Sequence, residues 1–201
     1  MPNQTILTIS GDAGNILTCE RTALNILTRM SGIATQTQQL VNKIANKKTQ
    51  LYATRKTAPG LRYFDKEAVE IGGGKKHRLR LDEMVMIKDN HIAVANSLLS
   101  LIRDAKKRYK KIEVEVENTE DAVLAAREGA TIIMLDNFSP EQIKKTIAVL
   151  KNQKLRDKIL LEASGGINLK NIAKYGKTGV DIISVGSITN SVKGVDLSLE
   201  I

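Results

Sequence analysis

The sequence of 201 residues lacks several features that would assign it to other classes of protein. It has one cysteine, Cys19, so no internal disulfide can form; we expect a cytoplasmic protein in which this side chain is a small buried hydrophobe. No run approaches the roughly 18 apolar residues that span a membrane, and the first ten residues do not read as a secretory signal. Neither a membrane protein nor a secreted protein is therefore expected.

Aromatic residues are also scarce, at 3% of the chain, which leaves few side chains to stack on bases. There is no helix-turn-helix, zinc or RNP signature, so we expect no nucleic-acid partner despite a net charge of +9. The densest basic stretch, residues 103–111, ends an expected helix and is interpreted as a solvated helix end. The net positive charge therefore favours binding of a small anionic substrate.

What the chain does have is an alternation of short apolar runs with segments of helical period. The expected strands are 51–53, 84–87, 112–116, 131–135, 159–161 and 180–185, and the expected helices are 94–109, 119–127, 141–151 and 169–175. Nearly all-apolar strands that alternate with helices predict a parallel sheet covered by helices. Periodicity alone leaves an open doubly wound sheet and a closed barrel as alternatives.

Polar residues directly follow each expected strand. Because the carboxyl ends of parallel strands share one face, these residues should meet there, as they do in the active site of a barrel. No GxGxxG follows the first strand, which disfavours a dinucleotide-binding fold. Before the barrel, residues 19–46 have helical spacing with an expected break at Ser31–Gly32, and residues 4–10 and 195–201 alternate like strands.

Cations gather in three of the loops near the expected strand ends. They are Arg55, Lys56 and Arg62 around a Pro-Gly turn, Lys75, Lys76, His77 and Arg78 behind a triple glycine, and Lys88 with His91. Each loop alone is equally consistent with a solvated turn. Together they would repel one another unless an anion bound among them, because arginine forks match carboxylate or phosphate and lysine supplies a point charge. The pattern favours a polyanionic small substrate.

Two further groups suit the same kind of site. Glu115 and Asp136 lie at or near neighbouring strand ends, where paired carboxylates would hold Mg²⁺ or ribose hydroxyls, or only pair with nearby lysines. Small residues follow the last two strands, at Ser164–Gly165–Gly166 and Gly186–Ser187, where backbone N–H groups could approach a phosphate. The two histidines form no zinc motif.

These motifs, in this order, resemble quinolinate phosphoribosyltransferase. The matching segments are 20–25, 31–35, 54–57, 59–62, 72–74 with 77–78, 87–91, 135–138, 163–166 and 185–186. The resemblance implies an incomplete α/β (TIM-like) barrel, a separate N-terminal α/β domain, and a homodimer with active sites at its interface. It implies a pentosyltransferase of NAD biosynthesis that joins quinolinate to phosphoribosyl pyrophosphate with Mg²⁺, and that releases pyrophosphate and CO₂ to give nicotinate mononucleotide.

The resemblance also implies roles for particular residues. Arg55, His77, Arg78 and Lys88 should hold the quinolinate carboxylates, Arg21 should come from the other subunit, and Lys56 and Lys88 should meet phosphoribosyl pyrophosphate. Ser164, Gly165 and Gly186 should cradle the 5′-phosphate, and Glu115 and Asp136 should hold ribose hydroxyls or Mg²⁺. Lys56, Lys88, Glu115 and Asp136 form the expected catalytic set.

Two departures from the family pattern stand out. Asn190 occupies a position where the family usually has a histidine, and most of the N-terminal domain has no counterpart. We therefore expect residues 1–20 and 192–201 to be a remnant of that domain's sheet, and 21–191 to be a helical lead-in and the barrel. The alternative function is a truncated, catalytically weak or non-catalytic relative that binds a small anionic ligand.

Overall fold

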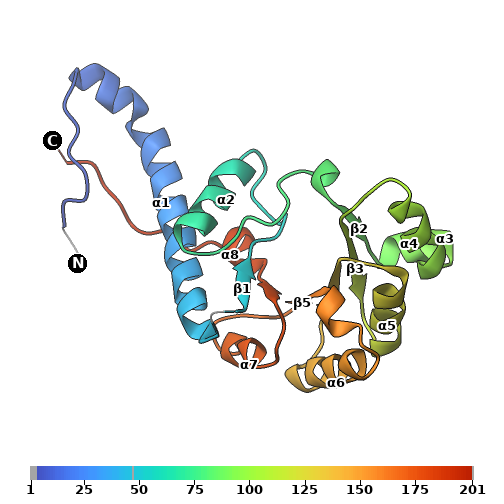
Figure 1. Cartoon of the computed structure of the whole chain (residues 1–201). Coiled ribbons are helices and arrows are strands. Elements are labelled where there is room, and N and C mark those ends of the chain that lie inside the picture. The colour runs from blue at the N-terminus through green and yellow to red at the C-terminus, as the bar shows by residue number, and fades with distance from the viewer. Residues whose placement is uncertain (1–3, 47, 201) are drawn as a thin grey trace.

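The computed structural model describes residues 4–46 and 48–200, which are built around one parallel sheet (Figure 1). Its strands are β1 (Gln50–Tyr52), β2 (Val85–Ile87), β3 (Ile112–Val116), β4 (Ile132–Asp136), β5 (Leu160–Ser164) and β6 (Ile182–Ser184). The order across the sheet is β1-β6-β5-β4-β3-β2, and every pairing is parallel. β1 and β2 are its two edges, so the expected incomplete barrel is confirmed.

Helices flank the strands and supply most of the remaining ordered chain. They are α1 (Ala13–Ile44), α2 (Arg62–Ile71), α3 (Asp89–Ala95), α4 (Leu98–Lys106), α5 (Thr119–Glu128), α6 (Pro140–Asn152), α7 (Ile172–Gly176) and α8 (Ser187–Asn190), with short 3₁₀ turns η1 (Leu81–Glu83) and η2 (Arg156–Lys158). The capping box expected before α6 forms, since the N–H of Gln142 donates to Ser139 and the Gln142 side chain accepts from the Ser139 N–H. Gly129 ends α5 in the left-handed region, at φ +92°.

The two faces of the sheet have opposite chemistry. On β3, Ile112, Val114 and Val116 are buried in the hydrophobic core, while the residues between them are glutamates. The register carries this alternation across the sheet, because Glu115 lies opposite Met134 and Met134 opposite Glu162. Parallel partners share a face. One face is therefore apolar and buried in the core that the helices complete, and the other is largely polar.

The long first helix corrects two expectations. α1 runs without interruption through Ser31–Gly32, so the expected break is wrong. Gly32 is required there for another reason: a Cβ at this position would lie 2.2 Å from the carbonyl oxygen of Lys193, where the C-terminal segment crosses the helix. That crossing is also tied by a hydrogen bond from the N–H of Val195 to the carbonyl of Thr28.

Other expectations also fail. Residues 4–10 and 195–200 alternate as strands do, but they form no strand; Ile201 lies outside the described residues. Alternation alone does not make a strand, because a strand also needs a regular ladder of hydrogen bonds to a neighbouring strand. Cys19 is exposed rather than buried. The helix expected over 94–109 is divided into α3 and α4 at Asn96, and α2 has no counterpart among the expected elements.

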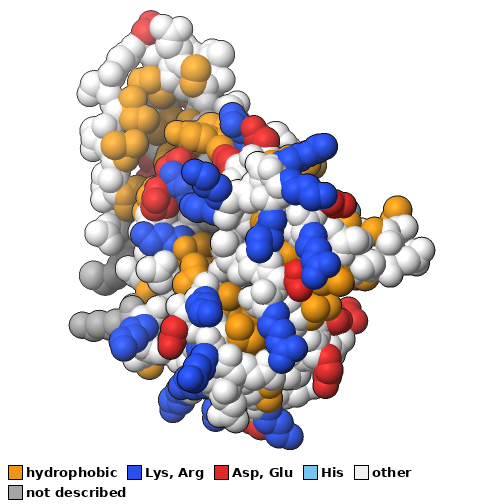
Figure 2. All heavy atoms as spheres, turned by 45° about the vertical axis from the view of Figure 1, so that its right-hand side comes forward, with side chains coloured by type: hydrophobic (Ala, Val, Ile, Leu, Met, Phe, Trp, Pro, Cys, Tyr) orange, Lys and Arg blue, Asp and Glu red, His pale blue; other side chains and the backbone are white. Residues whose placement is uncertain are grey.

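The N-terminal part of α1 projects away from the sheet together with both terminal segments (Figure 1). Hydrophobic side chains are visible along this arm in Figure 2. The exposed large ones in these segments are Ile6, Leu7, Ile9, Leu17, Leu27 and Val195. Within the described residues, no helix combines the length and the apolar character that a membrane crossing requires.

Candidate active site

The polar clusters expected at the strand ends do meet on one side of the sheet. The ammonium of Lys88, directly after β2, forms an ion pair with Glu115 of β3. Asp136 at the end of β4 is in register with Ser164 at the end of β5, and the Asn137 N–H donates to the Ser164 carbonyl over 2.9 Å. Residues that end or follow four of the strands therefore lie together at the carboxyl ends of the sheet, as the parallel topology requires.

Two glycines bring other parts of the chain close to this edge. Gly165 has φ +92°, and a Cβ there would lie 2.2 Å from Oδ1 of Asn137. A Cβ at Gly186, after β6, would lie 3.3 Å from the side chain of Lys56 and 3.6 Å from the Asn190 amide. Lys56 and Asn190 thus both lie beside Gly186, although they are far apart in the sequence. Asn190 reaches this point with an amide, which can donate a hydrogen bond.

Three of the cations, Arg55, Arg78 and Lys88, are partly buried, whereas Lys56 and Lys75 are exposed. The Nε atom of Arg55 is buried and has no hydrogen-bond partner among the described residues. The Arg78 guanidinium donates to the Met84 carbonyl over 3.2 Å, and burial lowers its pKa, with the charge of Arg55 also acting to lower it. An arginine donor that is buried without a partner is costly, so this group favours an anion at the site.

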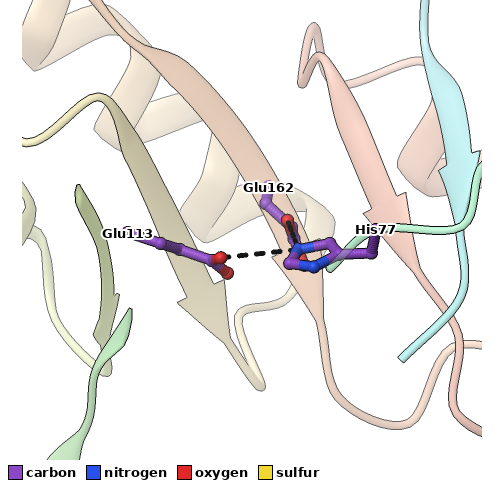
Figure 3. A group of neighbouring side chains, drawn as sticks. All are labelled: His77, Glu113 and Glu162. Atoms are coloured by element: carbon purple, nitrogen blue, oxygen red, sulfur yellow. Dashed lines mark ion pairs between the residues drawn. The ribbon is translucent and has the colours of Figure 1, made fainter. Parts of the chain in front are cut away.

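A buried cluster of His77, Glu113 and Glu162 lies on the polar face (Figure 3). Nε2 of His77 is 3.4 Å from a carboxylate oxygen of each glutamate, and both glutamates are fully buried. At this separation the contacts are ion pairs when the ring is protonated, and the four carboxylate oxygens have no hydrogen-bond partner among the described residues. His77 itself has φ +54°, an unusual conformation for a residue with a Cβ.

The hydrogen bonding of His77 decides how the cluster is used. One ligand atom from each of the three residues lies within 4.8 Å of the other two, as a metal site would require. However, the N–H of Arg78 donates to Nδ1 of His77 over 2.8 Å, which places the ring hydrogen on Nε2, facing the carboxylates. An imidazole that bound a metal through Nε2 would carry its hydrogen on Nδ1 and donate it to a partner there. We therefore interpret the cluster as a histidine held by two carboxyl groups.

Burial and the charges of its neighbours shift the pKa values of His77 and Glu113. Burial lowers the pKa of His77, but its ion pairs with Glu113 and Glu162 raise it more, to about 9. Burial also raises the pKa of Glu113, and the charge of Glu162 adds to this effect. The hydrogen bond from the Arg78 N–H to Nδ1 opposes protonation of the ring, because an imidazolium has no acceptor nitrogen.

Arg21 and the triple glycine lie apart from the strand ends where the other expected site residues meet. Arg21 lies in the N-terminal half of α1, where its side chain is exposed and its ion-pair partner is the neighbouring Glu20. The triple glycine is structural: a Cβ at Gly72 would lie 2.5 Å from the Ala34 carbonyl, and one at Gly74 would lie 2.7 Å from the Val69 side chain. These glycines let the loop before His77 pack closely against α1 and α2.

Glu113 and Glu162 were not among the residues expected at the site. The signal was present in β3, where Ile112-Glu113-Val114-Glu115-Val116 alternates with period two, which is typical of a sheet with one polar face. Treating the segment as one apolar run hides this alternation. Glu162 has no such local signal and is recognised only through the register of β5 against β4.

The fold and the site together define an α/β-barrel protein with a cluster of cationic side chains at the carboxyl ends of its strands. The family model described as quinolinate phosphoribosyl transferase, C-terminal domain, matches residues 33–200, and that of the N-terminal domain matches residues 1–31. The chain belongs to the quinolinate phosphoribosyl transferase family.

Named relatives are similar over nearly the whole chain. A probable nicotinate-nucleotide pyrophosphorylase [carboxylating] of Methanothermobacter thermautotrophicus is 51% identical, over 98% of this chain and 72% of the relative. The nicotinate-nucleotide pyrophosphorylase [carboxylating] of Mycobacterium leprae is 42% identical, over 98% of this chain and 70% of the relative.

Solved structures agree with this assignment. The nicotinate-nucleotide pyrophosphorylase from Francisella tularensis has a TM-score of 0.85 and 44% identity, over 94% of this chain and 66% of that one. A crystallised NadC deletion mutant has a TM-score of 0.86 and 41% identity, over 92% of this chain and 65% of that one. The chain thus spans about two thirds of the length of these solved proteins.

Proposed function

We propose that the protein transfers the phosphoribosyl group of phosphoribosyl pyrophosphate to quinolinate, with decarboxylation. The quinolinate ring nitrogen forms a bond to the anomeric carbon as the bond to pyrophosphate breaks. The 2-carboxylate then leaves as CO₂ and the ring carbon takes a proton, which gives nicotinate mononucleotide. The observation that carries the proposal is the group of half-buried cations at the barrel edge, with its unpartnered Arg55 Nε, in a chain of this family.

The described contacts suggest how the site is divided. Arg55, Arg78 and Lys88 surround the polar face and supply charge for the two carboxylates of quinolinate. Their partial burial strengthens binding, because two opposite charges attract each other more strongly where water is excluded than in bulk water. Ser164, Gly165 and Gly186 follow β5 and β6, where backbone N–H groups suit the 5′-phosphate, and Lys56 lies beside Gly186.

Recognition of two carboxylates can be tested by calorimetry. Quinolinate should bind wild-type protein at least tenfold more tightly than nicotinate, which has one carboxylate, since tenfold corresponds to about 1.4 kcal/mol. Arg78→Ala should remove most of this preference, because it deletes a charge-assisted contact. Arg80→Ala is the matched control, because Arg80 is exposed and pairs with Asp82. Equal affinity of wild-type protein for the two acids would contradict the proposed substrate.

We also propose that Glu115 and Asp136 hold Mg²⁺ together with the pyrophosphate substrate. Both lie on the polar face of neighbouring strands, and both offer the oxygen ligands that Mg²⁺ requires. Two carboxylates do not complete an octahedral shell, and Mg²⁺ commonly fills it with waters and substrate phosphates. When bound, the ion would neutralise charge on the leaving pyrophosphate.

Asp136→Asn should lower turnover at least a hundredfold at low Mg²⁺, and higher Mg²⁺ should recover part of the loss. The amide keeps the shape of the side chain but removes one unit of negative charge, which weakens attraction to a hard cation. Rates across a magnesium titration provide the measurement, with exposed Asp104→Asn as the control. A wild-type rate and magnesium response in Asp136→Asn would show that this carboxylate has no such role.

We further propose that the active unit is a homodimer. The projecting arm of α1 exposes apolar side chains, Leu17 and Leu27 among them, which a second copy would cover. Arg21 lies in the N-terminal half of the same helix, so a dimer that covers this arm would bring it to the barrel of the partner. An isologous contact of this kind gives each barrel one arginine from the other chain.

A further inference from the structure

Lys66 of α2 is fully buried, which is rare for lysine unless a carboxylate pairs with it. The ion pairs of the described residues do not include Lys66. Instead, its ammonium donates to two backbone carbonyls: a short hydrogen bond to Lys76 and one of 3.0 Å to Arg78. These two carbonyls lie on either side of His77.

The turn that Lys66 binds is the one that places the site's cations. Its start is fixed to β1, because the Lys75 N–H donates to the Leu51 carbonyl over 2.8 Å. His77 then adopts a left-handed conformation, which L residues disfavour, and its ring reaches across the polar face to Glu113 and Glu162. Contacts on both sides must therefore hold this turn, and Lys66 provides those on the α2 side.

Electrostatics argue that Lys66 is not placed there for stability alone. Burial lowers its pKa to about 8, and the charges of Arg62, Arg55 and Arg78 lower it as well. Glu83 acts in the opposite direction, but a buried cation near three others still destabilises the fold, and an apolar side chain of the same length would avoid that cost. The benefit that remains is geometric, since an ammonium can bind two carbonyls at once.

We propose that Lys66 is a positioning residue that fixes the Lys76–Arg78 turn, so that Arg78 faces the substrate carboxylates and His77 is seated between Glu113 and Glu162. The proposal rests on the proposed function, because it assigns Lys66 an indirect part in quinolinate binding. Lys66 does not itself contact the substrate. It acts through Arg78, whose carbonyl it holds and whose guanidinium donates to Met84 and approaches the sulfur of Met86.

Lys66→Met is the direct test, because it keeps the length of the side chain and removes the donor. The quinolinate KM should rise at least tenfold, while the KM for phosphoribosyl pyrophosphate should change less than twofold. Leu150→Ala, a core change in the outer helix α6, is the control for lost stability alone. It should lower Tm and leave both KM values within twofold of wild type.

Histidine NMR gives a second readout that does not depend on catalysis. The chain has two histidines, and in each one Nδ1 accepts a backbone N–H, from Arg78 at His77 and from Lys88 at His91. In ¹⁵N-histidine protein, Lys66→Met should shift the ring signals of His77 and leave those of His91 unchanged. Lys66→Gln, which keeps one shorter donor, should raise the quinolinate KM at least threefold and serves if Lys66→Met does not fold.

The two readouts separate the possible failures. A folded Lys66 variant with unchanged His77 signals and an unchanged quinolinate KM would overturn the positioning role. If wild-type protein shows no activity with quinolinate, the proposed function fails, and the His77 signals still decide whether Lys66 holds the turn.

Discussion

Mixing Arg21→Ala protein with Lys88→Ala protein is expected to restore activity that neither variant has alone. In a mixed dimer, the barrel with Lys88 receives Arg21 from the other chain, so one of its two sites is intact. Random mixing in equal amounts should then recover about a quarter of the wild-type sites, since half of the dimers are mixed. Activity is measured after the dimers have exchanged, with the fraction of mixed dimers determined by native mass spectrometry.

The matched control is a mixture of Lys88→Ala with Lys56→Ala protein. Lys56 and Lys88 both follow strands of the same barrel, so a mixed dimer of this pair contains no intact site. Recovery in the first mixture and none in the control would support an arginine supplied by the partner. No recovery, with mixed dimers present and the parent chain active, would mean that each barrel works alone.

Gly165→Ala is expected to abolish activity and to lower the free energy of unfolding by about 2–4 kcal/mol. The new Cβ would lie 2.2 Å from Oδ1 and 2.8 Å from the backbone nitrogen of Asn137, so the two loops after β4 and β5 must separate. The φ of +92° adds a strain of roughly 1–2 kcal/mol for any L side chain. Urea unfolding and steady-state rates measure the two effects.

The neighbouring glycine provides the comparison for this variant. Gly166 has φ +62°, and a Cβ there would meet nothing within 4 Å, so Gly166→Ala carries the strain without the contact. It should lose only about 1 kcal/mol of stability. Equal losses for the two variants would show that close packing against Asn137 has no part in shaping this end of the barrel.

The strand ends could be predicted because their chemistry is local. A run such as residues 131–135 followed by Asp136–Asn137 specifies a buried strand and a polar exit, and parallel topology then brings the exits together. Arg78 and Lys88 follow the same logic, being charged and placed in loops beside strands. The roles expected of individual residues came from the family resemblance, because composition and spacing indicate only the kind of site.

Lys66 and Glu162 could not be found in this way. A lysine on an amphipathic helix usually points to water, and only the packing of α2 against the loop before His77 buries this one. Glu162 follows Leu160 and Leu161 in a strand that reads as apolar, and its neighbours on the polar face come from other strands. In both residues, long-range contacts rather than local sequence determine the environment.

The formation of nicotinate mononucleotide tests the central claim most directly. Purified protein is incubated with quinolinate, phosphoribosyl pyrophosphate and Mg²⁺, and the nucleotide and CO₂ are quantified together. We expect equal amounts of the two products, none when either substrate is omitted, and no CO₂ when nicotinate replaces quinolinate. Protein that is folded and binds quinolinate, yet forms no nucleotide at saturating substrate and Mg²⁺, would contradict the proposed reaction.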